Sequence, residues 1–483
     1  MYSISPEDLK KLDTTFILLS MKRRGISFCV WKNLHERNEM LEGMTDVDIY
    51  LPLESRYEFN ALCSELGGVE VRSATISFSG ISHYLFPGGN GYPIHLHVYH
   101  LLFTGESHLK DYLLPLGGKI LANKVVDNEL GFVVAPSDEN LLIILRFYLK
   151  RSGILGAFLY LREYSDYKVQ ENRLKLEHGI TSLPLLFQDY EIQKLAKLIS
   201  KGNFWRHFFI GKTIRYRLTG FRKYSNAKAL WISYTNLLKL VGNKVFFKEK
   251  KSMVDIGRFV VITGPDGAGK STLINEVGAR FSKHFTVKFL HFGQPAPSVL
   301  TLLVHVMLWF RRAIYSFRPN KTTDFSGASK KKNVSLIFAL RYLALAYDRN
   351  RVGRKALAYV NRGFLVIADR YPSNNLGEMD SPKLDPELAG NWWFRQMAYM
   401  ENRLYHSILE SDLLIRVKVS RQTAMARNAA RVKNHKETDQ EIVERHTAFN
   451  KLSFNAKKQL IFENEGSLET AANTLFFAIW AEL

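Results

Sequence analysis

Hydrophobic residues follow three different patterns along this chain, and each pattern predicts a different kind of structure. Residues 1–136 mix short β-like runs such as Val47–Leu51 with helical stretches and turns, which is typical of an α+β domain. Residues 137–250 lack strand alternation and are expected to be helical. Residues 256–483 alternate apolar strands with helices, which predicts a doubly wound α/β domain with a parallel sheet.

Capping signals and cysteine content add detail to this division. Ser5–Asp8 has the features of a helix start, and Ser137–Glu139 is expected to cap the first helix of the middle region. No charged and apolar leader is visible at the start, so we expect no secretory signal. With only Cys29 and Cys63, the chain has no disulfide framework, and we expect a cytoplasmic protein with two buried thiols.

Positive charge is concentrated in one part of the chain. The formal net charge is +21, and fourteen Lys and Arg residues stand against two acidic residues between Lys201 and Arg258. Aromatic residues such as Trp205 and Trp231 are interleaved with them. Three interpretations stay open: a basic helical connector, peripheral contact with an anionic membrane, and binding of a polyanion, with nucleic acid the least favoured. The oligomeric state is also open, a homodimer included.

A second apolar stretch, Val299–Phe310, is followed at once by Arg311 and Arg312. Its twelve residues are too few to span a bilayer of about 30 Å. We expect a core helix or an interfacial helix here, which would leave the protein at most peripheral to the inner membrane surface.

A complete phosphate-binding loop occupies Gly264–Thr272, between the apolar strand Phe259–Ile262 and the helical run Leu273–Val277. Its glycines let backbone N–H groups surround anionic oxygens, and the helix start adds its positive dipole end. Lys270 can reach the β- and γ-phosphates, and the Ser271 hydroxyl can bind Mg²⁺. The sequence therefore predicts binding of ATP with Mg²⁺. The residues expected to bind this cofactor are Gly264, Gly267, Gly269, Lys270, Ser271 and Thr272.

Four motifs stand out in order along the second half of the chain. The first is the phosphate loop, which contains an aspartate, Asp266. The others are Ala346–Arg349, Gly363–Tyr371 and Ser411–Ser420. In these motifs, which span most of residues 257–460, the chain resembles thymidylate kinases.

The resemblance implies roles for individual residues. Asp266 would contact the acceptor sugar, and Arg349 and Asn375 would contact its base or phosphate. The chemistry of the residues adds that Asp369 can hold Mg²⁺ at the carboxyl edge of the sheet and that Arg370 can clamp an acceptor phosphate. Two further arginines, Arg427 and Arg431, are four residues apart on one expected helix and can close over the donor phosphates.

The chain also departs from the family pattern on the acceptor side. The family's Arg-Glu-Pro-Gly-Gly loop is replaced by His291–Pro297, and Leu345 stands where those kinases stack an aromatic ring on the base. An acceptor other than thymidylate is therefore compatible with the sequence.

Near the N-terminus, Val30–Asn33 is followed by an Asp-x-Asp pair, Asp46 and Asp48, on an expected strand. Side chains two apart on a strand share a face, so both carboxylates can bind the same divalent metal. In this feature residues 1–136 resemble the DNA polymerase β-type nucleotidyltransferases. That family's third carboxylate should lie on a later strand, and the best candidate, Ile94–Val98, carries His95 and His97 where an aspartate is expected. These histidines could bind metal or serve as packing residues.

We therefore expect an ATP- and Mg²⁺-dependent phosphotransferase acting on a nucleoside monophosphate or another small phosphorylated or hydroxylated molecule. One alternative is a kinase of a glycan or lipid-linked glycan at the inner membrane surface. Another is a nucleotide-sensing regulatory protein whose nucleotidyltransferase-like domain does not react. The sequence leaves the N-terminal activity open.

Overall fold

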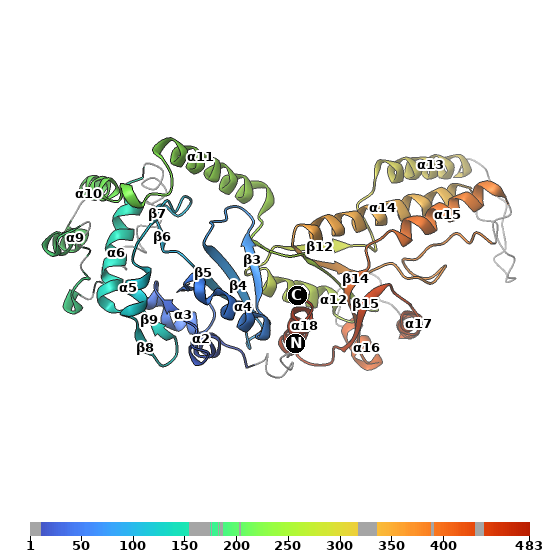
Figure 1. Ribbon diagram of the computed structural model, residues 1–483. Helices are drawn as coiled ribbons and strands as arrows, with labels where there is room; N and C mark the ends of the chain where they lie inside the picture. Colours follow the sequence, from blue (N-terminus) through green and yellow to red (C-terminus); the bar gives the residue numbers. More distant parts are fainter. Residues whose placement is uncertain are drawn as a thin grey trace. The chain divides into compact units, whose positions relative to one another are not determined.

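The computed structural model describes residues 11–153, 174, 176–181, 183, 187–201, 204–316, 336–387, 391–429 and 439–483. The chain divides into two compact units, Met1–Val254 and Asp255–Leu483. Figure 1 colours the first from blue to green and the second from yellow to red. The expected helix start at Ser5–Asp8 lies outside the described residues.

The first unit contains a mixed sheet with short helices, followed by longer helices. Its helices are α2 (Thr14–Arg23), α3 (Arg37–Leu41), α4 (Arg56–Glu65), α5 (Gly117–Ala122), α6 (Pro136–Arg151), α9 (Asp189–Lys201), α10 (Phe204–Arg217), α11 (Asn226–Gly242) and the π-helical η5 (Asn243–Phe247). Its 3-10 turns are η1 (Leu34–Glu36), η2 (Leu53–Ser55), η3 (Leu176–His178) and η4 (Thr219–Phe221). Its strands are β1 (Cys29–Val30), β2 (Val47–Tyr50), β3 (Val69–Ser73), β4 (Ile81–Pro87), β5 (Pro93–Tyr99), β6 (Phe103–Thr104), β7 (Tyr112–Leu113), β8 (Val125–Asp127), β9 (Gly131–Val133) and β10 (Lys251–Met253).

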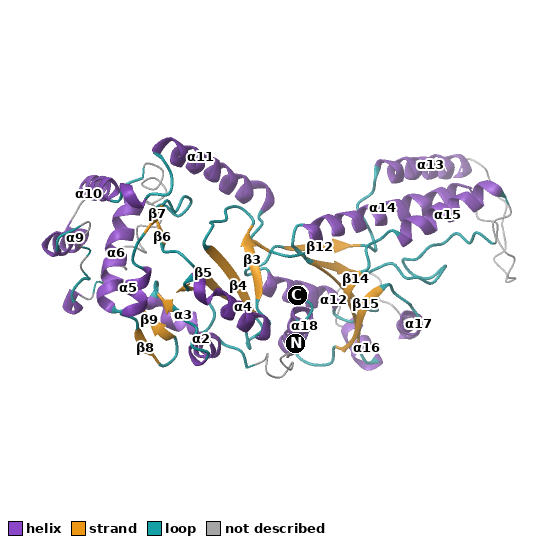
Figure 2. Cartoon of the chain, viewed as in Figure 1, coloured by secondary structure: helices purple, strands orange, loops and turns teal. Residues whose placement is uncertain are grey.

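Eight of these strands form one sheet in the order β10-β3-β4-β5-β2-β1-β9-β8, drawn in orange in Figure 2. The pairs β2–β5 and β1–β9 are parallel, and the other neighbours are antiparallel. Alternation along β2 separates two cores, because successive strand residues point to opposite faces. Ile49 packs in the core that includes residues of α2 and α4, whereas Tyr50 packs in the core that includes residues of α6.

The helical region predicted for residues 137–250 lies in the same unit as the strands before it. Helix α6 packs on the sheet through Leu141, Leu145 and Tyr148, and α9 and α10 pack on α6. The cap of this helix lies two residues earlier than the expected Ser137, because the helix begins at Pro136 with Ala135 as the extended cap residue. Proline suits the first helical position because its fixed φ is already helical and no N–H is needed there.

The second unit is built on a five-stranded sheet whose paired strands are all parallel, in the order β12-β13-β11-β14-β15. The strands are β11 (Arg258–Thr263), β12 (Val287–His291), β13 (Leu365–Asp369), β14 (Ser411–Lys418) and β15 (Ala456–Glu463). The helices are α12 (Lys270–Phe281), α13 (Val299–Ser316), α14 (Leu336–Asn361), α15 (Trp392–His406), α16 (Arg421–Ala429), α17 (Asp439–Asn450) and α18 (Leu468–Trp480). The architecture agrees with the α/β class expected from the sequence.

Successive side chains of β11 also point to opposite faces of their sheet, and different helices of this unit pack on the two faces. Phe259 and Val261 pack with Ala346 and Ala356 of α14. Helix α12 contacts the same sheet and packs against α18 through Phe281 and an array of aromatic rings. The two cysteines of the chain are free and buried in the first unit, as expected.

The helix predicted at Val299–Phe310 is confirmed, because this stretch forms part of α13. A buried carboxylate accepts hydrogen bonds at the start of α13. Asp348 of α14 accepts hydrogen bonds from Ser298 N at 3.1 Å and Thr301 Oγ1 at 2.6 Å. None of the helices in the described part of the chain has the length and apolar character needed to cross a lipid bilayer.

Replacing this carboxylate tests how α13 is anchored. Asp348→Ala should lower the free energy of unfolding by about 1–2 kcal/mol, because the first turn of α13 loses its capping acceptor. Thermal unfolding followed by circular dichroism measures the change. Arg351→Ala, which removes an exposed partner of the same carboxylate at 3.4 Å, should have a much smaller effect. Equal losses in the two variants would contradict the capping role.

Candidate functional site

The phosphate-binding loop is positioned by the central strand of the parallel sheet. Strand β11 is buried from Phe259 to Thr263 and lies between β13 and β14. In this register Ile262 is directly opposite Asp369, the last residue of β13. The carboxyl ends of parallel strands meet at one edge of a sheet, which is where ligands of open α/β sheets bind. The loop after β11 and the Asp369-Arg370 pair therefore leave the sheet side by side.

The loop has a backbone that other residues would not adopt easily. Gly267 and Gly269 have φ angles of 89° and 83°, in the region that favours glycine. At Gly264 an added Cβ would lie 2.5 Å from the carbonyl oxygen of Val417. Helix α12 then starts at Lys270, and its cap residue supplies no side-chain hydrogen bond. That residue is Gly269, which has no side chain to accept from the first-turn N–H groups, a common arrangement for anion binding.

Three cationic side chains surround the loop carboxylate of Asp266. Its oxygens lie 3.2 Å from Arg445 Nη1, 3.5 Å from Arg370 Nη2 and 3.8 Å from Lys270 Nζ. Lys270 also donates a 2.8 Å hydrogen bond to the carbonyl of Pro265. Arg370 has a φ of 62°, a left-handed conformation that is uncommon outside glycine. The structure thus brings together three of the predicted residues, Asp266, Lys270 and Arg370.

A cavity of about 450 Å³ opens beside these charges. It is lined by Pro265, Asp266, Arg370, Glu378, Met379, Arg445, Ala448, Phe449 and Leu452. Its volume lies in the range of pockets that hold small molecules. Its lining combines charged side chains, Asp266, Arg370, Glu378 and Arg445, with apolar ones such as Phe449 and Leu452. Such a pocket can hold a flat or apolar group while the two arginines bind an anionic one.

Asp369 meets a requirement for a metal-binding carboxylate. Its Oδ1 atom is buried and has no hydrogen-bond partner among the described residues. Its other oxygen lies 3.3 Å from His291 Nδ1. A buried carboxylate oxygen normally needs a donor or a cation, so Asp369 fits Mg²⁺ or a water bound to it. Ser271, the second predicted Mg²⁺ ligand, is exposed in the first turn of α12.

Arg427 of α16 lies near the end of the loop. Its Nη2 donates to the carbonyl of Asn464 at 3.0 Å, and its buried Nη1 has no acceptor among the described residues. A Cβ built on Gly269 would be 3.4 Å from this Nη1. Asn464 in turn donates to the carbonyl of Ala268 at 2.8 Å. Arg427 therefore lies beside the loop, and its predicted contact with the donor phosphates stays a prediction, whereas Arg431 lies outside the described residues.

The remaining two predicted residues contact the protein instead of the cavity. Arg349 is buried and donates to the carbonyl of Phe292 at 3.0 Å and to Tyr405 Oη at 2.6 Å, and it forms an ion pair with Asp380. The Asn375 amide donates to the carbonyl of Lys451 at 3.2 Å. Neither residue lines the cavity. Their predicted contacts with an acceptor stay predictions, and in this structure both have a positioning role.

Several residues of the site were not found by sequence reasoning. Arg445 and Phe449 come from α17, and Asp380 joins Arg349 to Arg370, whose Nη1 lies 3.6 Å away. These residues belong to no motif that we recognised. For Arg445 and Phe449, the one available signal was their position in the chain after the basic segment around Arg427.

Comparison with known proteins adds little to this geometry. No family model matches the chain, and no curated protein matches it. Among solved structures, a thymidylate kinase from Candida albicans is similar at 14% sequence identity, with a TM-score of 0.28, over 47% of this chain and 92% of that one. A TM-score this low does not establish a common fold. None of these comparisons supports a nucleotidyltransferase-like first unit, which stays a prediction.

The first unit has its own cluster of acidic and histidine side chains. Asp48 of β2 is directly opposite His97 of β5 in the sheet, and its Oδ1 lies 2.9 Å from His97 Nδ1 and 2.5 Å from Lys32 Nζ. Asp46, just before β2, lies 2.5 Å from His95 Nδ1. The structure thus places the strand with the two histidines next to the Asp-x-Asp strand.

These contacts bear on the predicted metal role of Asp46 and Asp48. Asn33 Nδ2 approaches the second oxygen of Asp48 at 3.4 Å, so both oxygens of this buried carboxylate have donors. A metal ion would have to displace Lys32 from it. The surroundings of Asp48 do not fit metal binding as they stand. The predicted metal role of Asp46 stays a prediction, and we derive no metal-dependent step for this unit.

Burial dominates the titration of the cluster. It lowers the pKa values of His83 and His95, and it lowers the pKa of His97 to about 4 although Asp48 acts in the opposite direction. Burial would also raise the pKa of Asp48, but Lys32 and His97 outweigh it and hold that pKa well below its usual range. His83 and His97 are stacked with ring centroids 4.4 Å apart, and His83 Nδ1 lies 3.0 Å from His95 Nε2. The fold therefore favours neutral histidines beside an ionised aspartate.

This cluster should make the first unit sensitive to acid. Between pH 6.5 and about 4 the unfolded chain binds protons at His97 that the folded chain does not, so stability falls as the pH falls. Within this window, each such histidine should lower the free energy of unfolding by on the order of 1.4 kcal/mol for each unit by which the pH falls. Urea unfolding at several pH values in this window measures the free energy of unfolding of His97→Asn. Its pH dependence should correspond to about one bound proton fewer than that of the wild-type protein. His178→Asn, at an exposed position, should leave it unchanged; equal slopes in all three proteins would contradict the assignment.

Proposed function

We propose that the second unit transfers the terminal phosphoryl group of ATP to a small acceptor held in the cavity beside Asp266. The observation that carries this proposal is that Asp266 belongs to the phosphate-binding loop and also lines the cavity. A donor bound at the loop and an acceptor bound in the cavity would thus meet at one carboxylate. Phosphoryl transfer depends mainly on such positioning and on neutralising charge.

The donor side of the proposal uses the loop and its neighbours. Backbone N–H groups of the loop and the Lys270 ammonium would bind the phosphates, and Arg427 would add a cation near Gly269. Ser271 and Asp369 are the side chains that fit Mg²⁺, which supplies charge neutralisation between the β- and γ-phosphates when bound.

The acceptor side favours an acceptor that already carries a phosphate. Arg370 and Arg445 present two guanidinium groups to the cavity, and guanidinium groups bind phosphate through paired hydrogen bonds. The attacking acceptor oxygen would form a bond to the γ-phosphorus while the bond to the β–γ bridging oxygen breaks, and the nucleoside diphosphate leaves. A phosphate acceptor needs no base. For a hydroxyl acceptor, Asp266 would be the group placed to take the proton.

Loss of the loop lysine tests the donor half. Lys270→Ala should lower ATP-dependent phosphorylation of a panel of nucleoside monophosphates, sugars and sugar phosphates by about 100-fold or more, since it removes charge stabilisation of the transferring group. Lys355→Ala, at an exposed position of α14, is the matched control and should retain full activity. Turnover that survives Lys270→Ala would refute the kinase assignment. Binding of ATP without turnover on any acceptor would favour the regulatory alternative instead.

Loss of the cavity arginines tests the acceptor half. Arg445→Ala should raise the KM for a phosphorylated acceptor by roughly 10- to 100-fold, the loss expected for a hydrogen bond between charged groups. The KM for ATP should change little, because Arg445 comes from α17 and lines the acceptor cavity. Steady-state kinetics with each substrate varied in turn separates the two constants. A larger rise in the KM for ATP would place Arg445 on the donor side and contradict the arrangement.

A further inference from the structure

Helix α11 packs against its own unit with its polar and small residues. Its buried residues are Ala229, Ser233 and Asn236. Ser233 Oγ lies 2.6 Å from His108 Nε2, and Asn236 Nδ2 donates to the carbonyl of His108 at 2.8 Å. Specific hydrogen bonds therefore fix the fully buried residues of this face. Most helices of soluble proteins have the reverse arrangement, with the apolar face buried.

The opposite face of α11 is apolar and exposed. At about 100° per residue, its exposed apolar side chains fall within an arc of roughly 120° that points away from the buried residues. These side chains are Leu230, Trp231, Tyr234, Leu238 and Val241. Leu230 is 69% exposed and Trp231 is 68% exposed. In Figure 1 this helix lies at the outer surface of its unit.

The π-helical turn η5 extends this face. Val245, Phe246 and Phe247 are all exposed, Phe246 to 78%. The turn is closed by Asn243, whose Nδ2 donates to the carbonyl of Glu249 at 2.7 Å and whose Oδ1 accepts from Glu249 N at 3.0 Å. These paired hydrogen bonds hold the exposed aromatic residues in place. We call the apolar residues of α11 and η5 together the α11 face.

Charge around the α11 face has one sign. Between Asn226 and Lys248 the sequence contains no acidic residue. The lysines on or beside the face are Lys228, Lys239, Lys244 and Lys248, and all are exposed. An apolar stripe with aromatic residues and flanking lysines is the arrangement of helices that lie in the plane of a membrane surface.

We propose that the α11 face binds the surface of an anionic lipid bilayer. The apolar and aromatic side chains enter the boundary between headgroups and acyl chains, and the lysines bind lipid phosphates. With seventeen residues α11 is about 25 Å long, so it lies on the surface and does not span it. A contact with a second copy is disfavoured, because a two-fold interface would bring the lysines of both copies together.

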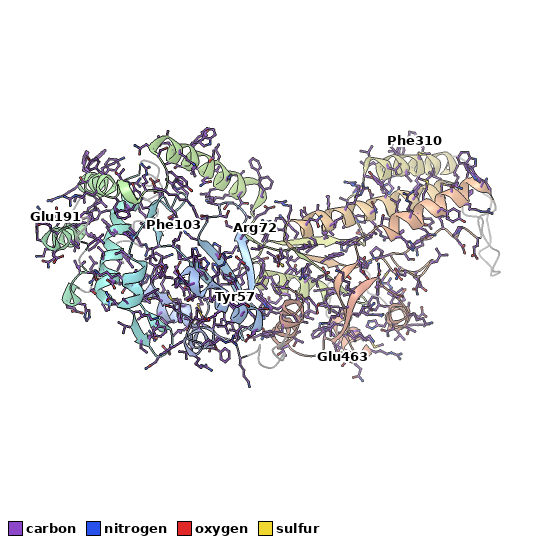
Figure 3. All side chains as sticks on the ribbon, in the orientation of Figure 1. Tyr57, Arg72, Phe103, Glu191, Phe310 and Glu463 are labelled. Carbon is purple, nitrogen blue, oxygen red and sulfur yellow. The ribbon has the colours of Figure 1, made fainter. Side chains whose placement is uncertain are left out.

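Helix α13 also exposes apolar residues, among them Phe310, which Figure 3 labels. Its apolar stretch Val299–Phe310 contains no charged residue. The proposal does not depend on this helix.

Flotation of the full-length protein with lipid vesicles tests the proposal. The wild-type protein should float with phosphatidylethanolamine vesicles that contain phosphatidylglycerol, and less with pure phosphatidylcholine vesicles. The double variant Trp231→Ser/Leu238→Ser should lose roughly tenfold or more of its partition into the anionic vesicles. Tyr57→Ser is the matched control: Tyr57 is an 85% exposed aromatic residue on α4 of the same unit, labelled in Figure 3, and its loss should have no effect. Lys239→Gln/Lys244→Gln should weaken binding to anionic vesicles only, as added salt should.

Other outcomes would overturn the proposal. Absence of wild-type flotation at moderate salt would do so, as would equal binding of the wild-type protein and the Trp231→Ser/Leu238→Ser variant. A concentration-dependent dimer in light scattering that this variant abolishes, without vesicle binding, would assign the face to a second copy. Circular dichroism of each variant confirms that a loss of binding does not come from unfolding.

Discussion

The register of the parallel sheet in the second unit is the constraint on which the candidate site depends. Ile262 is opposite Asp369, and Asp369 is opposite His291, so three neighbouring strands end at the same level. Each strand then delivers one part of the site: the phosphate loop, the Asp369-Arg370 pair, and the segment that Arg349 holds. A shift of β13 by one residue would turn Asp369 to the other face of the sheet, since strand side chains alternate. The chemistry of the site is thus a consequence of strand packing.

Asp266 gives this edge its electrostatic character. A single carboxylate faces three cations, and the cations outnumber it at the place where anionic phosphates would bind. In the absence of ligand, Asp266 keeps these long side chains close to the positions that a phosphate would require. Less side-chain entropy is then lost when a ligand binds. The first unit differs in this respect, because Lys32 and His97 already pair with the buried carboxylate of Asp48.

The parts of this structure that follow from local sequence were predictable. The phosphate loop could be identified because strand, glycines, lysine and helix are consecutive, and the sheet edge at Asp369-Arg370 followed from one apolar strand. Arg445 could not be identified, because it meets Asp266 across 179 residues and no local pattern encodes that contact. The hydrogen bonds that Arg349 donates within the protein could not be predicted for the same reason, since its acceptors come from separate segments. Periodicity predicted helices in the middle region, but it does not show which face of a helix the protein covers, and in α11 the covered face is the polar one.

Two successive residues of α14 define a short closed loop in the second unit. Arg349 holds the carbonyl groups of Phe292 and Gly293, and Asp348 holds the N–H of Ser298. The four residues between these anchored positions, Gln294–Pro297, therefore form a bridge. Contacts with α14 fix its two ends, whichever residues the bridge itself contains. The entropy of closing such a bridge grows only slowly with its length, by about 0.6 kcal/mol for each doubling. This bridge is accordingly a place where insertions can accumulate at little cost to the fold, and where related chains can differ in length while the strand edge beside it stays unchanged.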